Sequence, residues 1–407
     1  MTETARTAPR IASITTSSVD FPLDVPMADA VHYIPGRAAL LVEVTCDDGR
    51  VGTGESAIYG GSASAIEALI HDVLAPRALG ADPTRPELLW QRMLWPSHQL
   101  GTGGALPMAL AGIDIAVWDL LGQLAGLPLF RLLGGHQDRV RAYASGGFYL
   151  DGKDAAALAE EFKACMARGY RHGKLKVGRT PDTPMNPLAH MVEPDFATVS
   201  LAEDLARVGA VREAVGDDFH LMVDANNAWD LSTALAAGRE FDRLGVHWFE
   251  EPVATDDRVG SARLAAALDV PVAGYETETQ LSGFRDLIGA GAVDIVQPDV
   301  IWAGGITGCR RIAALAYAAG LRCVPHVYST AVSIAANLHF MASLPNCYLL
   351  EFDQNPNALR TELLTEPIEP DADAVVTVPD RPGLGIRLDR TTMSRYAMAP
   401  PRTSELP

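Results

Sequence analysis

Basic residues are scarce in this chain of 407 residues. It has 33 lysines and arginines against 51 aspartates and glutamates, which gives a formal net charge of -18. A negative field of this kind repels the phosphate groups of nucleic acids and of anionic lipids, so we expect neither nucleic acid nor membrane as a partner. A small anionic substrate would have to meet a local positive charge, such as a metal ion.

Paired cysteines and long apolar runs are also missing. The five cysteines are odd in number and none has CxxC spacing, which predicts reduced thiols in a cytoplasmic protein. The first ten residues lack the apolar stretch of a signal peptide. The most apolar region, Leu106 to Leu133, predicts a buried helix and not a membrane span, because charged residues interrupt it at Asp114, Asp119 and Arg131.

Two common catalytic patterns are absent. The ten histidines contain no HxH or HExxH motif, which argues against a histidine-rich zinc site such as that of a hydrolase. Gly304 and Gly305 do not belong to a GxGxxG pattern, so a dinucleotide site is not expected.

The first part of the chain, residues 1–138, predicts an α+β domain. The apolar and turn patterns indicate a strand over Ala38–Val44 with a hairpin partner over Val51–Glu55. Helical periods cover Ser64–Leu74 and Pro107–Ala125, and Gly126 is a plausible end of the second helix.

A repeating unit fills residues 139–366: a short apolar run, a polar residue at its end, and a helix rich in Ala and Leu. Alternating strands and helices predict parallel strands with right-handed crossovers, and eight strands favour a closed (β/α) barrel over an open sheet. Residues 367–407, rich in Asp and Pro, predict loops and a strand. The eight predicted strands are Val140–Ala144, Gly173–Val177, Leu221–Val223, His247–Phe249, Val270–Gly274, Ile295–Pro298, Cys323–Pro325 and Cys347–Leu350.

One loop is longer than the others. Arg179–Ser200 contains four prolines and little periodicity, which is typical of a loop. Because it follows a strand, it would lie at the mouth of the barrel, where long loops are often functional. The alternative is a tolerated surface insertion.

Charged residues end the predicted strands at a regular spacing. Asp224, Glu250 and Glu276 are 26 residues apart. Residues that end successive strands point into the C-terminal mouth of a barrel, where three carboxylates repel one another unless a cation lies between them. Hard oxygen ligands favour Mg²⁺. Any single one of them could instead cap a helix. The series continues with Asp299, His326 and Glu351, at intervals of 23, 27 and 25 residues.

Two lysines face this acidic cluster. Lys174 and Lys176 share one face of their strand because side chains alternate. Repulsion between the two lysines would lower their pKa, and so would a nearby metal ion, so that one lysine could act as a neutral base. On other strands, Asp299 beside His326 would fix the imidazole tautomer and raise its basicity.

Together these segments resemble the enolase superfamily, and within it the mandelate racemase subgroup, the mandelate racemase/muconate lactonizing enzyme family. The resemblance covers nearly the whole chain. The matching segments are AGIDIAVWD at 111–119, KLK at 174–176, DAN at 224–226, FEEP at 249–252, PVAGYE ending in Glu276, QPD ending in Asp299, GGIT at 304–307, His326 and Glu351.

The resemblance implies a modified TIM barrel, (β/α)7β, under an α+β capping domain built from the N-terminal region and the C-terminal tail, and a homo-oligomer. It implies Mg²⁺ ligands at Asp224, Glu250 and Glu276. The catalytic residues that it implies are Lys176 as base on one substrate face, Asp299 and His326 as a dyad on the other, Lys174 against the substrate carboxylate, and Glu351 as a hydrogen-bonding electrophile.

The sequence departs from the family at the third ligand. Gly274 is separated from Glu276 by Tyr275, whereas the family more often has Gly directly before Glu, so Glu278 is an alternative ligand. Equal spacing favours Glu276.

The chemistry implied is Mg-dependent removal of the α-proton of a small carboxylate substrate through an enolate, as the superfamily is known to do. The first hypothesis is dehydration of an acid sugar, an aldonate or aldarate, to a 2-keto-3-deoxy acid. A racemase, epimerase or cycloisomerase acting on a hydroxy acid or lactone would use the same bases. A non-catalytic binding protein would have lost a ligand or base, and none is missing. The residues expected to bind a polyhydroxylated substrate are Asn226, Tyr149 and Tyr328, with His32 and Tyr33 in a flexible segment from Val25 to Gly36.

Overall fold

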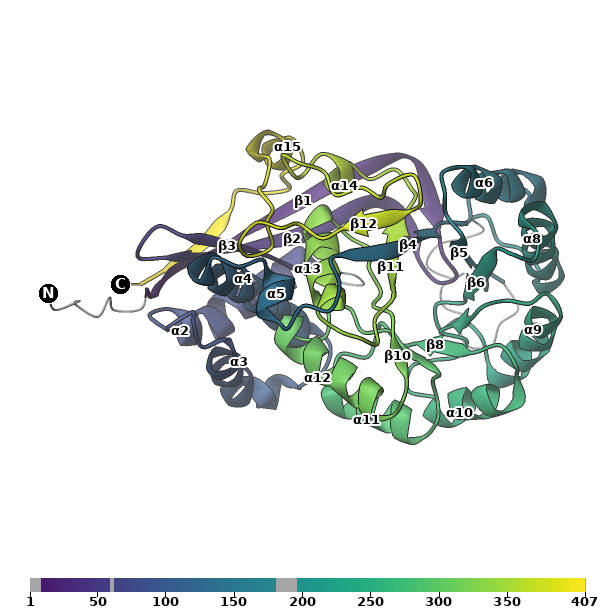
Figure 1. Cartoon of the computed structure of the whole chain (residues 1–407), viewed down its shortest axis with the longest axis horizontal. Helices are drawn as coiled ribbons and strands as arrows, with labels where there is room; N and C mark the ends of the chain where they lie inside the picture. The colour runs from purple at the N-terminus through teal and green to yellow at the C-terminus, as the bar shows by residue number, and fades with distance from the viewer. Residues whose placement is uncertain (1–8, 59–61, 181–195, 407) are drawn as a thin grey trace, which may run out of the picture.

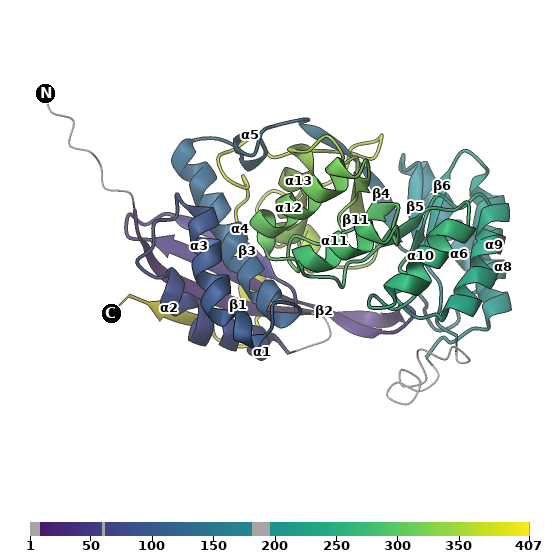
Figure 2. The same cartoon turned by 90° about the horizontal axis from the view of Figure 1, so that it is seen from below.

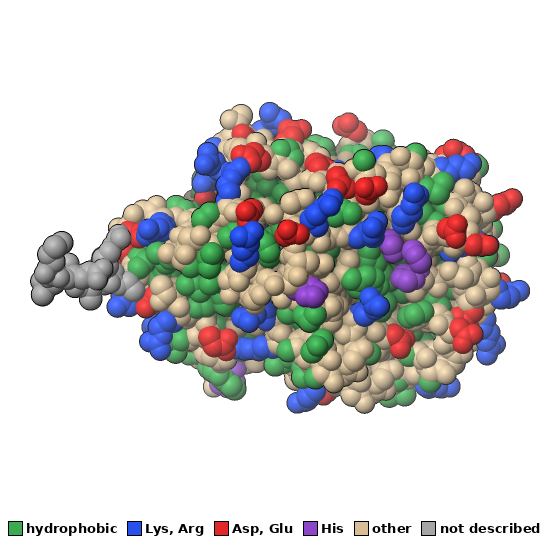
Figure 3. Space-filling model, viewed as in Figure 1, with side chains coloured by type: hydrophobic (Ala, Val, Ile, Leu, Met, Phe, Trp, Pro, Cys, Tyr) green, Lys and Arg blue, Asp and Glu red, His purple; other side chains and the backbone are tan. Residues whose placement is uncertain are grey.

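The computed structural model describes residues 9–58, 62–180 and 196–406. Two sheets organise this part of the chain, one antiparallel and one parallel (Figure 1). Seen from below, the antiparallel sheet and the helices on it lie beside the parallel sheet and its ring of helices (Figure 2). Figure 3 shows acidic and basic side chains interspersed over one face of the molecule.

The antiparallel sheet, with its helices, forms the cap. Its order is β13-β1-β2-β3, with β1 at Ile11–Ala28, β2 at Tyr33–Cys46, β3 at Val51–Ser56 and β13 at Arg402–Glu405. Strands β1 and β2 make a long ribbon, and β13 brings the C-terminal tail back to β1. The helices of the cap are α1 (Ala63–Ala68), a π-helical stretch (Leu69–Leu74), α2 (Ala75–Ala78), α3 (Pro86–Leu94), a 3-10 stretch (Trp95–Leu100), α4 (Ala105–Ala125) and α5 (Leu129–Leu132).

The parallel sheet is the barrel, with strand order β10-β9-β8-β7-β6-β5-β4-β11. All eight predicted strands are present with shifted ends, and seven long helices connect them in the described part of the chain. The predicted (β/α)7β barrel with an α+β cap is therefore confirmed, while the domain boundaries at 138 and 366 stay a prediction. The strands are β4 (Arg139–Ser145), β5 (His172–Lys176), β6 (His220–Asp224), β7 (Phe249–Glu250), β8 (Val272–Gly274), β9 (Ile295–Val296), β10 (Arg322–Cys323) and β11 (Leu349–Asp353).

Helices cover the outside of the barrel strands. Each connecting helix follows its strand, as the repeat predicts, and three shorter elements belong to the last part of the chain. The connecting helices are α6 (Ala155–Ala167), α8 (Leu201–Val215), α9 (Leu231–Arg243), α10 (Arg258–Ala267), α11 (Leu281–Gly289), α12 (Gly305–Ala318) and α13 (Ala331–Ala342); the later elements are α14 (Ala358–Thr361), β12 (Val375–Thr377), which pairs with β4, and α15 (Arg390–Arg395).

The ribbon of the cap differs from the expectation. Strand β1 was not predicted, because serines, threonines and two prolines blur its apolar alternation. The segment from Val25 to Gly36, expected to be flexible, is the hydrogen-bonded end of this ribbon. The Asp29 carboxylate accepts the backbone N–H groups of Val31 and His32 at 2.8 and 2.6 Å and so closes the turn.

Helix α4 joins the cap to the barrel. It is long and apolar enough by composition to cross a membrane, yet most of it is buried in the fold. Asp114 accepts the N–H and the hydroxyl of Thr307 at 2.9 and 2.6 Å, and Asp119 accepts the N–H groups of Thr53 and Leu384 at 2.9 and 2.7 Å. Burial raises the pKa of Asp114 to about 7 and that of Asp119 to about 6. Asp114 therefore connects the cap to the barrel, and Asp119 connects α4 to β3 and to the C-terminal tail.

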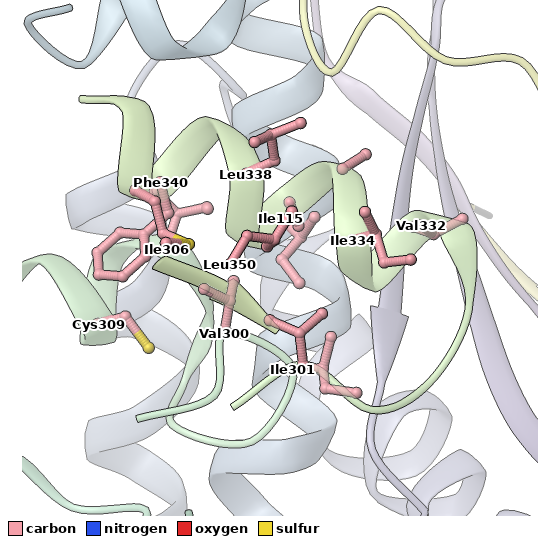
Figure 4. Close-up of a cluster of buried hydrophobic side chains, with 14 of the residues drawn as sticks. Ile115, Val300, Ile301, Ile306, Cys309, Val332, Ile334, Leu338, Phe340 and Leu350 are labelled. Carbon is pink, nitrogen blue, oxygen red and sulfur yellow. The ribbon is translucent and has the colours of Figure 1, made fainter. Parts of the chain in front are cut away.

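Apolar packing completes this junction. Figure 4 shows Ile115 of α4 between side chains of the barrel, with Val300, Ile301 and Ile334 close by. All four side chains are 3% exposed or less. Cap and barrel consequently share one continuous core.

A glycine allows β3 to lie directly on α4. A Cβ atom on Gly54 would stand 2.1 Å from the carbonyl oxygen of Gly112, which is backbone that has no room to move. We expect Gly54→Ala to lower the free energy of unfolding by about 1–3 kcal/mol through overpacking. Thermal denaturation would measure the loss.

Gly209 provides the matched control. It lies within α8, and a Cβ there would meet nothing within 4 Å. Gly209→Ala should leave stability unchanged or raise it by up to about 1 kcal/mol. Equal effects of the two substitutions would contradict this account of the junction.

Candidate active site

A cavity of about 1060 Å³ opens between the cap ribbon and the C-terminal ends of the barrel strands. Its wall combines residues from both parts, so the site depends on how the cap sits on the barrel. The cap contributes His32, Tyr33 and Arg37, and the barrel contributes Phe148, Lys176, Asn226, Glu251, Glu276, Trp302, His326 and Tyr328.

The two lysines of β5 meet the carboxylates of the neighbouring strands. Register pairs Lys176 with Asp224 and Asp224 with Glu250 across β5, β6 and β7. The Lys176 Nζ atom lies 2.5 Å from Asp224 Oδ2. The Lys174 Nζ atom lies 3.4 Å from Asp224 Oδ2 and 2.9 Å from Glu351 Oε1, and it also pairs with Glu250. All five side chains are at most 7% exposed.

Ion pairs with the carboxylates set the direction in which the pKa of each lysine is shifted. Burial by itself would lower their pKa, but the carboxylates outweigh it. Asp224 holds the pKa of Lys176 above its usual value, and Glu250 and Glu351 do the same for Lys174. These direct ion pairs favour the protonated form of both side chains, and they outweigh the repulsion between the two lysines.

Glu276 and Glu278 point to different places. Glu276 lines the cavity, and its Oε2 lies 3.3 Å from His326 Nε2. Glu278 turns away from the cavity: its Oε1 accepts the N–H of Gln280 at 2.8 Å, and its Oε2 lies 3.5 Å from Arg258. Only Glu276 of this pair can reach a ligand in the cavity.

Asp299 and His326 form a buried pair in the segments that follow β9 and β10. The Nδ1 atom of His326 lies 2.8 Å from Asp299 Oδ2, and the other oxygen of Asp299 accepts the N–H of Ile301 at 3.0 Å. Burial alone would lower the pKa of His326, but Glu276 and the hydrogen bond to Asp299 raise it to about 10. The imidazole is therefore cationic at neutral pH, with Nε2 turned towards the cavity.

Further hydrogen bonds fix the carboxylates. Glu250 Oε2 accepts Trp248 Nε1 at 3.0 Å and Gln297 Nε2 at 2.9 Å. Glu351 accepts the hydroxyl of Ser145 at 2.6 Å and a backbone N–H at 2.9 Å. Each carboxylate is thus held in one orientation before any ligand binds.

Glu55 of the cap holds the loop that carries His326. It accepts the hydroxyl of Thr330 at 2.5 Å, the hydroxyl of Ser329 and the N–H of Ser333 at 2.9 Å, at the N-terminus of α13. Burial raises the pKa of Glu55 to about 7, and these hydrogen bonds oppose the rise.

Several residues of the site were missed from the sequence. Glu251, the second glutamate of FEEP, is buried, and it accepts the N–H of Glu276 at 2.9 Å. Arg37 makes a buried ion pair with Asp353 of β11 at 2.8 Å, and its guanidinium lies 3.8 Å above the ring of Tyr328. The repeated glutamate of FEEP was an available signal for Glu251. Nothing in the pattern of β2 marks Arg37.

The residues predicted to bind substrate divide into two groups. His32, Tyr33, Asn226 and Tyr328 line the cavity. Tyr149 does not line it, and this prediction was wrong. Its hydroxyl donates to Asp204 Oδ1 at 2.6 Å, and Arg207 lies 4.0 Å from its ring, so it is part of the packing behind the wall.

The long loop is described only at its ends, since residues 181–195 lie outside the described part of the chain. The two ends meet where Arg179 Nε donates to the carbonyl of Phe196 at 2.6 Å. The ring of Phe196 lies 5.0 Å from that of Tyr33, which lines the cavity. The ends of the loop therefore adjoin the cavity wall, as predicted from its place after β5.

The donor set fits a magnesium ion. In the described part of the chain no three carboxylate, imidazole or thiol groups surround one point, and the Lys174 ammonium pairs with two of the expected ligands. Burial is the largest cause that raises the pKa of Glu250 and of Glu276, and the neighbouring carboxylates add to the rise. Asn226 Oδ1 and Glu276 Oε2 are buried oxygens without a hydrogen bond in the described residues. A hard cation would satisfy these oxygens.

Comparison with known proteins identifies the family. Residues 11–134 match the model of the mandelate racemase/muconate lactonizing enzyme N-terminal domain, and residues 157–392 match the enolase C-terminal domain-like model. The chain belongs to the mandelate racemase/muconate lactonizing enzyme family of the enolase superfamily.

Two relatives are named for an acid sugar or for the lactone of one. The chain is 37% identical over 402 residues to D-galactarolactone cycloisomerase of Agrobacterium fabrum, covering 96% of this chain and 100% of that protein. It is 38% identical to arabinonate dehydratase of Saccharolobus solfataricus, covering 87% of this chain and 89% of the relative.

A solved structure of the family holds magnesium. The L-talarate/galactarate dehydratase of Salmonella typhimurium, liganded with Mg and L-lyxarohydroxamate, has a TM-score of 0.84 and 31% identity, covering 100% of this chain and 97% of that one. The fit of the carboxylate cluster to a hard cation agrees with the metal in this family member.

The two candidate third ligands give a direct test. We expect Glu276→Gln to weaken Mg²⁺ binding by more than about tenfold, because it removes a charged oxygen from the cluster. Titration calorimetry with Mg²⁺ would measure the affinity. Glu278→Gln is the matched control and should bind Mg²⁺ like the unchanged protein. The reverse pattern would make Glu278 the ligand.

Proposed function

We propose that this chain removes the α-proton of an acid-sugar carboxylate and expels the β-hydroxyl as water, giving a 2-keto-3-deoxy acid. The observation that carries the proposal is the pair of bases. Lys176 on β5 and His326 after β10 are five strands apart in the barrel order, with Glu276 after β8 between them. A substrate above the carboxylate cluster would present one face to each base.

The residues would divide the work as follows. Asp224, Glu250 and Glu276 would hold Mg²⁺, which when bound supplies a Lewis acid that stabilises charge on the substrate carboxylate. Lys174 would add a fixed positive charge beside it. The ion pair between Asp224 and Lys176 would weaken once Asp224 holds Mg²⁺, which would favour the neutral form of Lys176. The Nζ atom of Lys176 would then accept the α-proton.

His326 is suited to the acid step. Its raised pKa of about 10 keeps a proton on Nε2, which the imidazole would donate to the leaving hydroxyl. Asp299 on Nδ1 would hold the ring in position throughout. Trp302 lies 6.2 Å from the His326 ring and Phe148 5.2 Å from Lys176 Nζ, so apolar surface would limit water at both bases.

The lining of the cavity favours a polyhydroxylated substrate. His32 and Tyr33 from the cap, with Asn226 and Tyr328 from the barrel, offer hydrogen-bonding groups around the site. Arabinonate dehydratase, the relative at 38% identity, is named for an acid sugar.

A second candidate is cycloisomerisation or epimerisation. One relative that is matched over its whole length is a cycloisomerase named for a lactone. The same two bases would serve, with His326 returning a proton to the α-carbon in place of protonating a leaving hydroxyl.

We propose further that the protein works in the cytoplasm as a homo-oligomer without nucleic acid or membrane partners. All five cysteines are buried free thiols, which supports a reducing compartment. Light scattering of the purified protein would give the oligomeric state.

The reaction is tested by incubating the Mg-loaded protein with an acid-sugar library in D₂O. We expect a 2-keto-3-deoxy product. Lys176→Ala should lose about 10²–10⁴-fold in rate because it removes the base. If His326→Asn abolishes product but retains deuterium exchange at the α-carbon, the two proton steps belong to different residues. NMR and mass spectrometry follow both.

Lys163→Ala, which changes an exposed lysine on α6, is the control and should keep full activity. Deuterium incorporation with inversion and no keto acid would favour the second candidate. Full activity of Lys176→Ala would contradict the role of this lysine.

A further inference from the structure

The opposite end of the barrel carries a second group of ionisable residues. Side chains alternate along a strand, so the inward face of β5 that ends in Lys174 and Lys176 begins with His172. On β6 the face that ends in Asp224 begins with His220. These two histidines are paired in register at the N-terminal ends of their strands.

Two arginines lie near the start of the inward faces of other strands. Arg141 precedes Tyr143 on β4 by two residues, and Arg322 of β10 precedes Val324, which follows the strand, by two. Tyr143 and Val324 belong to a buried cluster inside the barrel. The arginines therefore lie one layer below this cluster, at the N-terminal mouth.

His247, just before β7, completes the group. Ring centroids of His172 and His220 are 4.4 Å apart, those of His220 and His247 4.8 Å, and those of His172 and His247 6.0 Å. We refer to Arg141, His172, His220, His247 and Arg322 as the basic mouth. Figure 3 shows a histidine patch bordered by Lys or Arg side chains on the face that displays the barrel strands in Figure 1.

Among the described residues, no carboxylate is a cause of the pKa shift of His172 or of His247. Burial, the neighbouring histidines and Arg141 lower the pKa of His172 to about 3, and burial, His220 and Arg322 lower that of His247 to about 4. Arg141 donates to the backbone carbonyl of Asp373 at 3.2 Å. Nearby, the carboxylate of Asp371 is engaged by Arg139.

With their lowered pKa, His172 and His247 are uncharged at neutral pH, so the positive charge of this mouth comes from Arg141 and Arg322, which make no ion pair within the described residues. The Nδ1 atom of His172 is also buried without a hydrogen bond in the described residues. Both observations point to a missing negative partner at this mouth.

A metal ion fits this mouth poorly. The rings of His172 and His220 stack with only 21° between their planes, so their nitrogens are not directed at one point. Two arginines beside them repel a cation. The same arginines and the imidazole N–H groups are the donors that bind phosphate oxygens in proteins.

We propose that the basic mouth binds a small phosphate-class dianion, at the end of the barrel opposite the active site. The arginines would supply charge and forked hydrogen bonds, and the histidines would donate from the ring nitrogens. The anion is either inorganic phosphate or the phosphoryl group of a small metabolite. The buried cluster with Tyr143 and Trp248 separates it from the catalytic carboxylates.

The test is titration of the Mg-loaded protein with inorganic phosphate, followed by calorimetry and by NMR of the imidazole C–H groups. Because phosphate could also enter the active site, variants separate the two. We expect the double variant Arg141→Gln with Arg322→Gln to weaken one phosphate-binding event by at least about tenfold. His220→Asn changes an exposed ring, and we expect it to weaken the same binding event. This variant tests the proposal even if the double variant folds poorly.

The matched control is Arg381→Gln with Arg395→Gln, which removes the same charge from exposed positions in the tail. It should bind phosphate like the unchanged protein. In the unchanged protein the signals of His172 and His220 should shift with phosphate, while that of the buried His339 should not. Repeating the titration with a hexose 6-phosphate distinguishes the sources: equal or tighter binding indicates a phosphorylated metabolite, and weaker binding indicates inorganic phosphate.

Two results would overturn the proposal. One is phosphate binding of equal strength in the unchanged protein, the double variant and His220→Asn, or no phosphate binding in any of the three. The other is tight Zn²⁺ binding that is lost in His220→Asn without any phosphate binding at this end.

Discussion

Like charge buried at one end of a barrel is the constraint on which the rest of this structure depends. Asp224, Glu250, Glu276 and Glu351 come from different strands and lie within one mouth, nearly closed to water. Carboxylates in such a place are unstable unless positive charge accompanies them. The chain supplies Lys174, Lys176 and His326 from the same strand ends, and the family adds magnesium. The arrangement that lets the barrel fold with these groups inside is also the arrangement that can stabilise an enolate.

The cap has a second part in this balance. It carries none of the three expected Mg²⁺ ligands, yet it closes the cavity and fixes elements of the barrel through buried polar contacts. Glu55 holds the loop that carries His326, and Arg37 pairs with Asp353 while covering Tyr328. A shift of the cap would therefore move the acid side of the site without touching its ligands. Specificity and catalysis are connected through these few contacts.

Sequence reasoning predicted the features that repeat and missed those that do not. The repeat of apolar runs and helical stretches predicted eight strands, and the nearly equal spacing of six charged residues predicted that they lie at strand ends, because a β/α unit has a nearly fixed length. Tyr149 was placed wrongly because its position near a strand end does not reveal that Asp204 and Arg207 engage it. Arg37 and strand β1 were missed because they belong to the cap ribbon, where polar residues and prolines hide the alternation. Spacing also does not show which carboxylates make direct ion pairs with the two lysines, and these pairs raise the pKa of both.

The pairing of β13 with β1 bears on how the chain reaches its native state. Ser13 lies opposite Glu405, so the outer edge of β1 stays uncovered during synthesis until β13 has left the ribosome. Until then β1 is an open strand edge of the kind that pairs with other molecules. Contacts so distant in sequence also form slowly. Nascent chains of this protein should consequently be most prone to association in the interval after the barrel is synthesised and before the last strand docks.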